Sequence, residues 1–245
     1  MSAAPERADV VALVAARDEE ASIGETVRAL SGLPNVTLVV VADDGSKDAT
    51  ASIASAAGAH VLRAARPRGK GSVLESALRR LPPARVWILA DGDLGVTAGE
   101  LAPVIATVLA GEADLAIALP PPQGGGFGLV KTSAGAAIRW LSGFRATAPL
   151  SGQRVLTGAA MRAVRPLAPG FGVETAMTVD AVRAGMTVVE VPAPLRHRAT
   201  GRDVAGFAHR ARQGIDIAAA LGRRIGGRSR VTERRSNVGR ERFDR

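Results

Sequence analysis

Short apolar runs of strand length alternate along this chain with segments of helical periodicity. The runs are rich in valine, isoleucine and leucine and lack polar alternation, which is typical of strands covered on both faces. They predict strands at residues 9–15, 36–42, 60–62, 85–90 and 114–119. Helices are predicted between them at residues 22–30, 48–57, 71–81 and 97–109. This alternation predicts an α/β fold, with a doubly wound, mostly parallel sheet and helices on both faces.

Two of these helices carry a sequence signal at their start. Ser22 with Glu25 and Thr97 with Glu100 have the spacing of capping boxes, in which each side chain bonds a backbone N–H at the helix start. We therefore expect the two helices to begin at Ser22 and Thr97.

The regular pattern stops at residues 120–128, where three prolines precede a glycine-rich run. This composition breaks helices and strands, so it predicts a loop. Its position directly after a strand favours a lid beside a ligand site over an interdomain linker. Further on, the pattern predicts helices at 131–141, 158–164 and 173–184, short strands at 153–157 and 187–191, and a last amphipathic helix at 204–221.

Length and composition fit one domain with short extensions. The chain has 245 residues, 47% of them hydrophobic, which is enough for a substantial core. We expect an N-terminal arm at 1–8, a single domain at 9–221 and a basic disordered tail at 222–245. The domain should consist of a nucleotide-binding half at about 9–119 and an acceptor half at about 120–221.

The net charge of +9 is concentrated in the tail. Residues 221–245 contain nine arginines and three acidic residues, so they carry +6 and the rest of the chain +3. This distribution argues against specific nucleic-acid recognition, and it is compatible with peripheral contact between the tail and an anionic membrane. The absence of cysteine excludes disulfides and thiolate metal sites. With no signal peptide or membrane-spanning run in the sequence, we expect a cytoplasmic protein, with peripheral attachment at the inner membrane face as an option.

Acidic residues follow three of the predicted strands, at 18–20, 43–44 and 91–93. Carboxyl ends of parallel strands meet at one edge of a sheet, where ligands bind, so we expect the three clusters to lie together. Like charges repel, and this arrangement favours a bound cation or a donor-rich ligand. Asp91 and Asp93, separated by one glycine, can converge on one hard cation. The structural alternative is that these residues form turns or cap the following helices.

The order of these motifs resembles that of family 2 glycosyltransferases. The family has Asp-Glu-Glu after strand one, Asp-Asp-Gly-Ser-x-Asp-x-Thr after strand two (residues 43–50 here), Gly-Lys-Gly before a helix (69–71) and Asp-x-Asp after strand four (91–93). Over about residues 9–215 the chain is similar to GT-A-fold members, especially polyprenyl-phosphate (dolichol-phosphate mannosyltransferase-like) sugar transferases and glucosyl-3-phosphoglycerate synthases. The resemblance implies transfer of a sugar from a UDP- or GDP-sugar, with Mg²⁺ or Mn²⁺ as cofactor.

The resemblance also implies roles for residues of the first half. Glu19 and Asp44 would hold the nucleotide base and ribose, as carboxylates that accept N–H and O–H groups. Lys70 would lie near the nucleotide or its diphosphate, unless it is simply an exposed lysine at a helix start. Asp91 would contact the nucleotide sugar and, with Asp93, bind the metal, which stabilises charge on the departing diphosphate as a Lewis acid.

Residues of the second half are assigned in the same way. Glu174 would be the general base, unless it is a first-turn glutamate favoured by the helix dipole. His197 falls where some GT-A enzymes supply a histidine to the metal, although a lone histidine is usually a surface residue. The candidate acceptor-binding residues are Gln153, Arg154, Arg198 and Arg202.

Several points stay open at this stage. We find no C-terminal transmembrane helices of the kind that many polyprenyl-phosphate transferases carry. The acceptor can therefore be a polyprenyl phosphate or a small molecule. The acceptor group that attacks the sugar can be a phosphate or a hydroxyl. Inverting and retaining outcomes both occur among the resembling enzymes. One alternative is a nucleotidyltransferase on a similar fold, but this chain lacks the glycine-rich turn that such enzymes carry after strand one. The other is a non-catalytic nucleotide-sugar-binding protein. Motifs of P-loop NTPases and nicotinamide dehydrogenases are missing.

Overall fold

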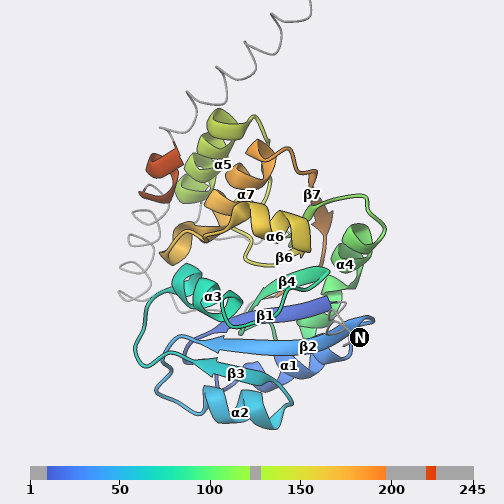
Figure 1. Cartoon of the computed structure of the whole chain (residues 1–245), viewed down its shortest axis with the longest axis vertical. Coiled ribbons are helices and arrows are strands. Elements are labelled where there is room, and N and C mark those ends of the chain that lie inside the picture. The colour runs from blue at the N-terminus through green and yellow to red at the C-terminus, as the bar shows by residue number, and fades with distance from the viewer. Residues whose placement is uncertain (1–9, 122–127, 197–218, 225–245) are drawn as a thin grey trace, which may run out of the picture.

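Seven strands form one sheet through the middle of the molecule (Figure 1). In spatial order they are β3 (His60–Arg63), β2 (Val36–Asp43), β1 (Val10–Ala16), β4 (Val86–Asp91), β6 (Arg154–Thr157), β5 (Leu115–Leu119) and β7 (Val188–Pro192). Neighbouring strands are parallel, except that β6 runs antiparallel to both β4 and β5. The predicted mostly parallel α/β sheet is confirmed. The structure is a computed structural model, and it describes residues 10–121, 128–196 and 219–224.

The helices cover both faces of this sheet (Figure 1). They are α1 (Ile23–Ser31), α2 (Thr50–Ala56), α3 (Lys70–Leu78), α4 (Ala102–Leu109), α5 (Gly128–Ser142), α6 (Gly158–Val164) and α7 (Val173–Arg183), with two 3₁₀ helices, η1 (Gly95–Leu101) and η2 (Gly170–Gly172). A further helical turn spans residues 219–224. None of the helices in the described residues is long and apolar enough to cross a membrane.

Alternate residues of each central strand point to opposite cores. In β1, Val10, Ala12 and Val14 pack with α1, α2 and α4, whereas Val11 and Leu13 pack with α3, α6 and α7. All five are essentially inaccessible to solvent. Burying one valine or leucine side chain contributes about 1.5–3 kcal/mol, so the two cores hold the sheet, and therefore its carboxyl edge, in a fixed arrangement.

The predicted helix at 97–109 is wrong in its first half. Residues Gly95–Leu101 form η1, and α4 begins only at Ala102, with Pro103 in its first turn. Proline is compatible with that position because the first N–H groups of a helix have no partner within the helix. The prediction had treated a 3₁₀ helix and an α-helix as one helix.

Both predicted capping boxes are also wrong. Ser22 precedes α1, but its hydroxyl donates to the carbonyl and the carboxylate of Glu19 and makes no cap bond. Thr97 lies inside η1, where its hydroxyl donates to the carbonyl of Leu94 at 2.6 Å. In both cases the hydroxyl is oriented toward a nearby acceptor instead of toward the backbone N–H groups at the helix start.

Parts of two predictions lie outside the described residues. Residues 122–127 of the predicted lid and residues 204–218 of the last predicted helix are among them, as are the predicted arm at 1–8, residue 9 and residues 225–245. The helical turn at 219–224 extends three residues beyond the expected end of the domain at 221. There, Arg224 pairs with Asp180 of α7.

Candidate active site

The loops after β1, β2 and β4 meet at one edge of the sheet, as the sequence predicted. The backbone N–H of Asp44 donates to the carbonyl of Ala16 at 2.9 Å, and that of Gly92 donates to the carbonyl of Ala15 at 3.0 Å. These bonds continue the register of three adjacent parallel strands beyond their ends. The three acidic clusters are therefore neighbours in space.

Most carboxylates of the first two clusters bind backbone N–H groups. Asp18 accepts from the N–H of Lys47 at 2.8 Å, and Glu20 accepts from that of Ala49 at 3.0 Å. In the opposite direction, the N–H of Glu20 donates to Asp48. In the first two loops, backbone N–H groups stabilise these carboxylates, so a bound cation or a donor-rich ligand is not needed to explain their proximity.

Asp44 fixes the turn that leads into Lys70. Its side chain is 6% exposed, and its two oxygens accept the backbone N–H groups of Arg68 at 2.7 Å and Gly69 at 2.8 Å. Gly69 has φ of +89°, a left-handed conformation that favours glycine. Glu19, partly buried at the same edge, accepts the hydroxyl of Ser22 at 3.2 Å. Asp44 thus fixes the conformation of the loop at Arg68 and Gly69, beside the expected nucleotide position.

Lys70 joins two carboxylates that are far apart in the sequence. Its Nζ lies 2.5 Å from Oδ1 of Asp91, at the end of β4, and 2.7 Å from Oε1 of Glu174, in the first turn of α7. The amide of Gln153, just before β6, donates to the other oxygen of Asp91 at 2.8 Å. Four predicted site residues from four parts of the chain therefore form one cluster.

The cluster is mostly shielded from water. The Lys70 side chain is 15% exposed and that of Glu174 is 9% exposed. Burial alone would lower the pKa of Lys70, but the charges of Asp91 and Glu174 and the hydrogen bonds to them raise it well above its ordinary value. Lys70 is therefore a permanent cation near neutral pH, and the three groups together carry one net negative charge.

Glycine is required at two positions around this cluster. A Cβ at Gly152 would collide with the ammonium of Lys70 and the carboxylate of Asp91. A Cβ at Gly71 would collide with the carbonyl of Ala168, where α3 crosses the loop before α7. At Gly152 the backbone lies against the charged groups, and at Gly71 it lies against the loop before α7. In both places a Cβ atom would not fit without a shift of the neighbouring atoms.

Arg154 does not fit its predicted acceptor-binding role. Its side chain is 1% exposed, and it donates to the carbonyl of Ser151 at 2.9 Å and to the hydroxyl of Thr178 at 2.8 Å. Burial lowers the pKa of its guanidinium to about 10, and the charges of Glu174 and Glu190 partly offset this effect. Arg154 stays charged near neutral pH and holds the Gln153 loop against α7.

The residues expected to bind a metal are only partly within the described structure. Asp91 ends β4 and Asp93 lies on the turn after it, both partly exposed, whereas His197, Arg198 and Arg202 fall outside the described residues. Within those residues, no group of three or more acidic or histidine side chains is placed to hold a metal. The two carboxylates still fit Mg²⁺ or Mn²⁺, because both prefer oxygen ligands and Mg²⁺ usually keeps open positions for phosphates.

Thr26 and Glu75 support the site and were not expected from the sequence. The buried hydroxyl of Thr26 donates to the carbonyl of Gly92 at 3.0 Å and accepts the N–H of Gly95 at 2.8 Å, which fixes the Asp91–Asp93 turn. Glu75 of α3 binds the loop before α7. In the sequence, each appears only as a polar residue within a predicted helix. That position does not indicate which groups the side chain contacts.

The sheet, its acidic edge and the lysine between two carboxylates define a glycosyltransferase of the GT-A type. A family model for Glycosyl transferase family 2 matches residues 11–162, which is more than half of the chain. The chain therefore belongs to glycosyl transferase family 2, and it is a nucleotide-sugar glycosyltransferase.

Solved structures of glucosyl-3-phosphoglycerate synthase from Mycobacterium tuberculosis are similar to this chain. The complex with Mg²⁺ and UDP has 26% identity and a TM-score of 0.76, with 89% of this chain and 79% of that chain covered. The complex with phosphoglyceric acid has 27% identity and a TM-score of 0.74, covering 89% and 80%. The complex with Mn²⁺, UDP-glucose and phosphoglyceric acid has 26% identity and a TM-score of 0.71, covering 87% and 80%. No curated protein sequence matches the chain at the same stringency.

Proposed function

We propose that this enzyme transfers a sugar from a UDP-sugar to a hydroxyl of a small acceptor that bears a phosphate group, and that it requires Mg²⁺ or Mn²⁺. The observation that carries the proposal is Lys70, held between Asp91 and Glu174. It links the nucleotide-binding half of the sheet to the acceptor half. In the proposed complex its charge would stabilise the departing diphosphate.

The donor would lie along the carboxyl edge of β1, β2 and β4. Glu19 and Asp44 offer carboxylate oxygens there for the N–H and O–H groups of the base and ribose. Both already accept one or two hydrogen bonds within the chain, and each carboxylate oxygen can accept another. UDP is favoured over GDP because the similar synthase structures contain UDP or UDP-glucose.

Asp91 and Asp93 would hold the metal, and His197 is the candidate for a third ligand. When bound, the metal supplies Lewis-acid stabilisation of the diphosphate. Lys70 and Gln153 each contact one oxygen of Asp91. Each carboxylate oxygen can accept a further partner, so Asp91 would contact the metal together with Asp93.

Glu174 would act on the acceptor. Lys70 orients one of its oxygens, and the other oxygen is then the one available to accept the proton of an attacking hydroxyl. Gln153 lies on the same side and is the remaining described candidate for acceptor contact. A phosphate-bearing acceptor is favoured because two of the similar synthase structures contain phosphoglyceric acid. Polyprenyl phosphate and membrane contact have no support from these relatives.

Product formation tests the proposal directly. We would incubate the full chain with UDP-glucose, 3-phosphoglycerate and Mn²⁺, and detect the glucosylated acid by mass spectrometry together with released UDP. GDP-mannose and a polyprenyl phosphate replace donor and acceptor in parallel reactions. We expect product only with the UDP-sugar, the small acid and metal. Absence of both transfer and UDP release with every pair would overturn the proposal.

A further inference from the structure

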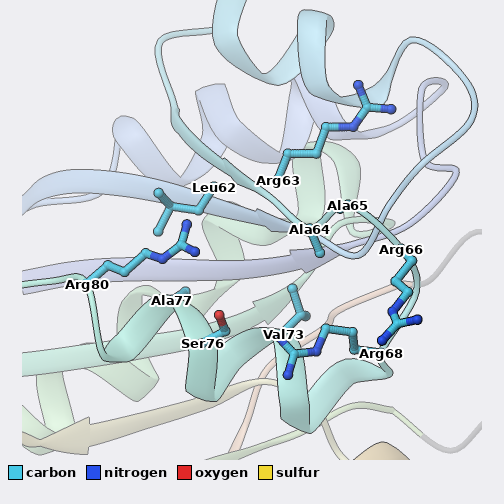
Figure 2. A pocket seen from close by; sticks show the side chains of 10 residues that line it. All are labelled: Leu62, Arg63, Ala64, Ala65, Arg66, Arg68, Val73, Ser76, Ala77 and Arg80. Atoms are coloured by element: carbon cyan, nitrogen blue, oxygen red, sulfur yellow. The ribbon is translucent and has the colours of Figure 1, made fainter.

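Four arginines surround a cavity whose lining residues do not include those of the Lys70 cluster (Figure 2). It has a volume of about 500 Å³ and lies between the edge strand β3, the loop that follows it and α3. Arg63, Arg66, Arg68 and Arg80 line it, and no acidic residue does. None of the residues assigned above to donor, metal or acceptor is among its lining residues.

Three of these arginines have no partner within the described residues. Arg63 is engaged elsewhere, since it donates to the carbonyl of Ser46 and pairs with Asp43 at 3.2 Å. The guanidinium groups of the other three form no ion pair or hydrogen bond with the part of the chain that the structure describes. In Figure 2, Arg66 and Arg68 lie at one end of the cavity and Arg80 at the other.

The floor between the arginines is apolar apart from one hydroxyl. Leu62, Val73 and Ala77 form it, and Ser76 of α3 adds an O–H group. This volume falls within the range of ordinary ligand pockets, which combine an apolar lining with a few polar groups. Like charges converging on such a space repel one another, and a bound anion would remove that repulsion.

We propose that this arginine pocket binds a small polyanion that carries phosphate groups, at a site separate from the donor. Guanidinium groups form bidentate, charge-assisted hydrogen bonds with phosphate, which favours a phosphate-bearing ligand over a neutral one. The pocket is concave, and its arginines lie at both ends, so a compact ligand that spans it fits better than a flat anionic surface. The loop that carries Arg66 and Arg68 is also the loop that Asp44 holds.

Pyrophosphate is a suitable probe, and titration calorimetry measures its binding to the full chain. Excess UDP, with EDTA present, is added in one arm because pyrophosphate can also enter the diphosphate position. The test variant is R66Q/R80Q. The control, R28Q/R162Q, removes the same two charges from exposed positions on α1 and α6. Circular dichroism checks that both variants fold, as we expect from side chains without protein partners.

We expect wild type and control to bind pyrophosphate equally in the presence of UDP. The test variant should bind about tenfold or more weakly, because charge-assisted hydrogen bonds are lost. Unchanged binding by R66Q/R80Q, no binding by wild type, or binding that UDP abolishes would each overturn the inference. Binding to phosphatidylglycerol vesicles without binding to pyrophosphate would also overturn it and would identify a membrane-facing surface. Failure of glycosyl transfer leaves this comparison unaffected.

Discussion

At the level of single residues, the charge of Lys70 controls the site. Asp91 and Glu174 are held within 3 Å of one ammonium, and neither is fully open to water. Two ionised carboxylates that converge on one point repel each other, and the ammonium between them removes that repulsion. The lysine therefore serves both folding and the expected chemistry, and its replacement should affect the two together.

Replacing Lys70 with methionine should remove activity and stability at once. The variant leaves two partly buried carboxylates facing each other, which we expect to cost about 3 kcal/mol of unfolding free energy. Transfer should fall by about 10² or more, because a charge near the leaving diphosphate is lost. Urea unfolding at neutral pH and initial rates check the two effects. Lys131→Met, at an exposed position of α5, is the control and should behave as wild type.

Replacing Glu174 with glutamine tests the proposed base. The amide keeps an acceptor for Lys70 but has no basic oxygen, so kcat for a hydroxyl acceptor should fall by about 10²–10⁴ while KM for the donor changes little. Transfer to a phosphate oxygen, already ionised near neutral pH, should tolerate the change. Steady-state kinetics with the exposed variant Glu100→Gln as control measure the difference. Unchanged kcat, or equal loss with both acceptors, would remove the base assignment.

At the level of elements, α3 is clamped to the loop before α7. Glu75 accepts hydrogen bonds from the Arg165 guanidinium at 3.0 and 3.2 Å and from the N–H of Leu167 at 3.2 Å. Lys70 begins α3, and Glu174 lies seven residues after Leu167 in the chain. The clamp therefore sets the distance between the two helix starts that supply the ammonium and the carboxylate.

The clamp should depend on pH. Burial raises the pKa of Glu75, but hydrogen bonds from Arg165, Leu167 and Arg79 outweigh it and lower the pKa. Its stabilisation is therefore present above the unfolded pKa of about 4.3 and is lost as pH falls through the lower folded value. Glu75→Gln should reduce stability near neutral pH by about 1–3 kcal/mol.

Unfolding free energies between neutral pH and about pH 3 measure this dependence. In that range, the curve of Glu75→Gln should fall less steeply than that of wild type, so the two converge in acid. The exposed variant Glu112→Gln serves as control and should follow the wild-type curve. Parallel curves for Glu75→Gln and wild type would contradict the assignment.

Elements were predictable from the sequence where apolar patterning decides them. The bounds of β2 and α6 agree with the prediction to within one residue, because β2 is a continuous apolar run of strand length and α6 has helical periodicity. The start of α4 was not predictable, since the switch from 3₁₀ to α-helix leaves that periodicity largely intact. The contact between Lys70 and Glu174 depends on strand order, which no local motif specifies.

At the level of the whole molecule, the site lies where the parallel strands β3, β2, β1 and β4 meet the antiparallel strand β6. Strands β3, β2, β1 and β4 bring Lys70 and Asp91, whereas the region from β6 to α7 brings Gln153 and Glu174. The far side of α7 contacts the helical turn at 219–224. The position of Glu174 thus depends on packing behind α7 as well as on the site itself.

Two truncations separate the contribution of this turn from that of the residues after it. Leu221 is 6% exposed and packs with Val179 of α7, and Arg224 pairs with Asp180. Ending the chain at residue 218 should therefore cost about 2–3 kcal/mol, mostly from the buried leucine, with a smaller share from the partly exposed ion pair. Ending it at residue 224 retains every one of these contacts and should leave stability unchanged.

Urea unfolding of the two truncated chains beside the full chain measures the difference. We expect the chain of 1–218 to lose transfer activity as well, because a less well packed α7 holds Glu174 less firmly against Lys70. The chain of 1–224 should keep both activity and stability. Equal stability of the two truncated chains would show that the turn does not support α7, since they differ only in residues 219–224.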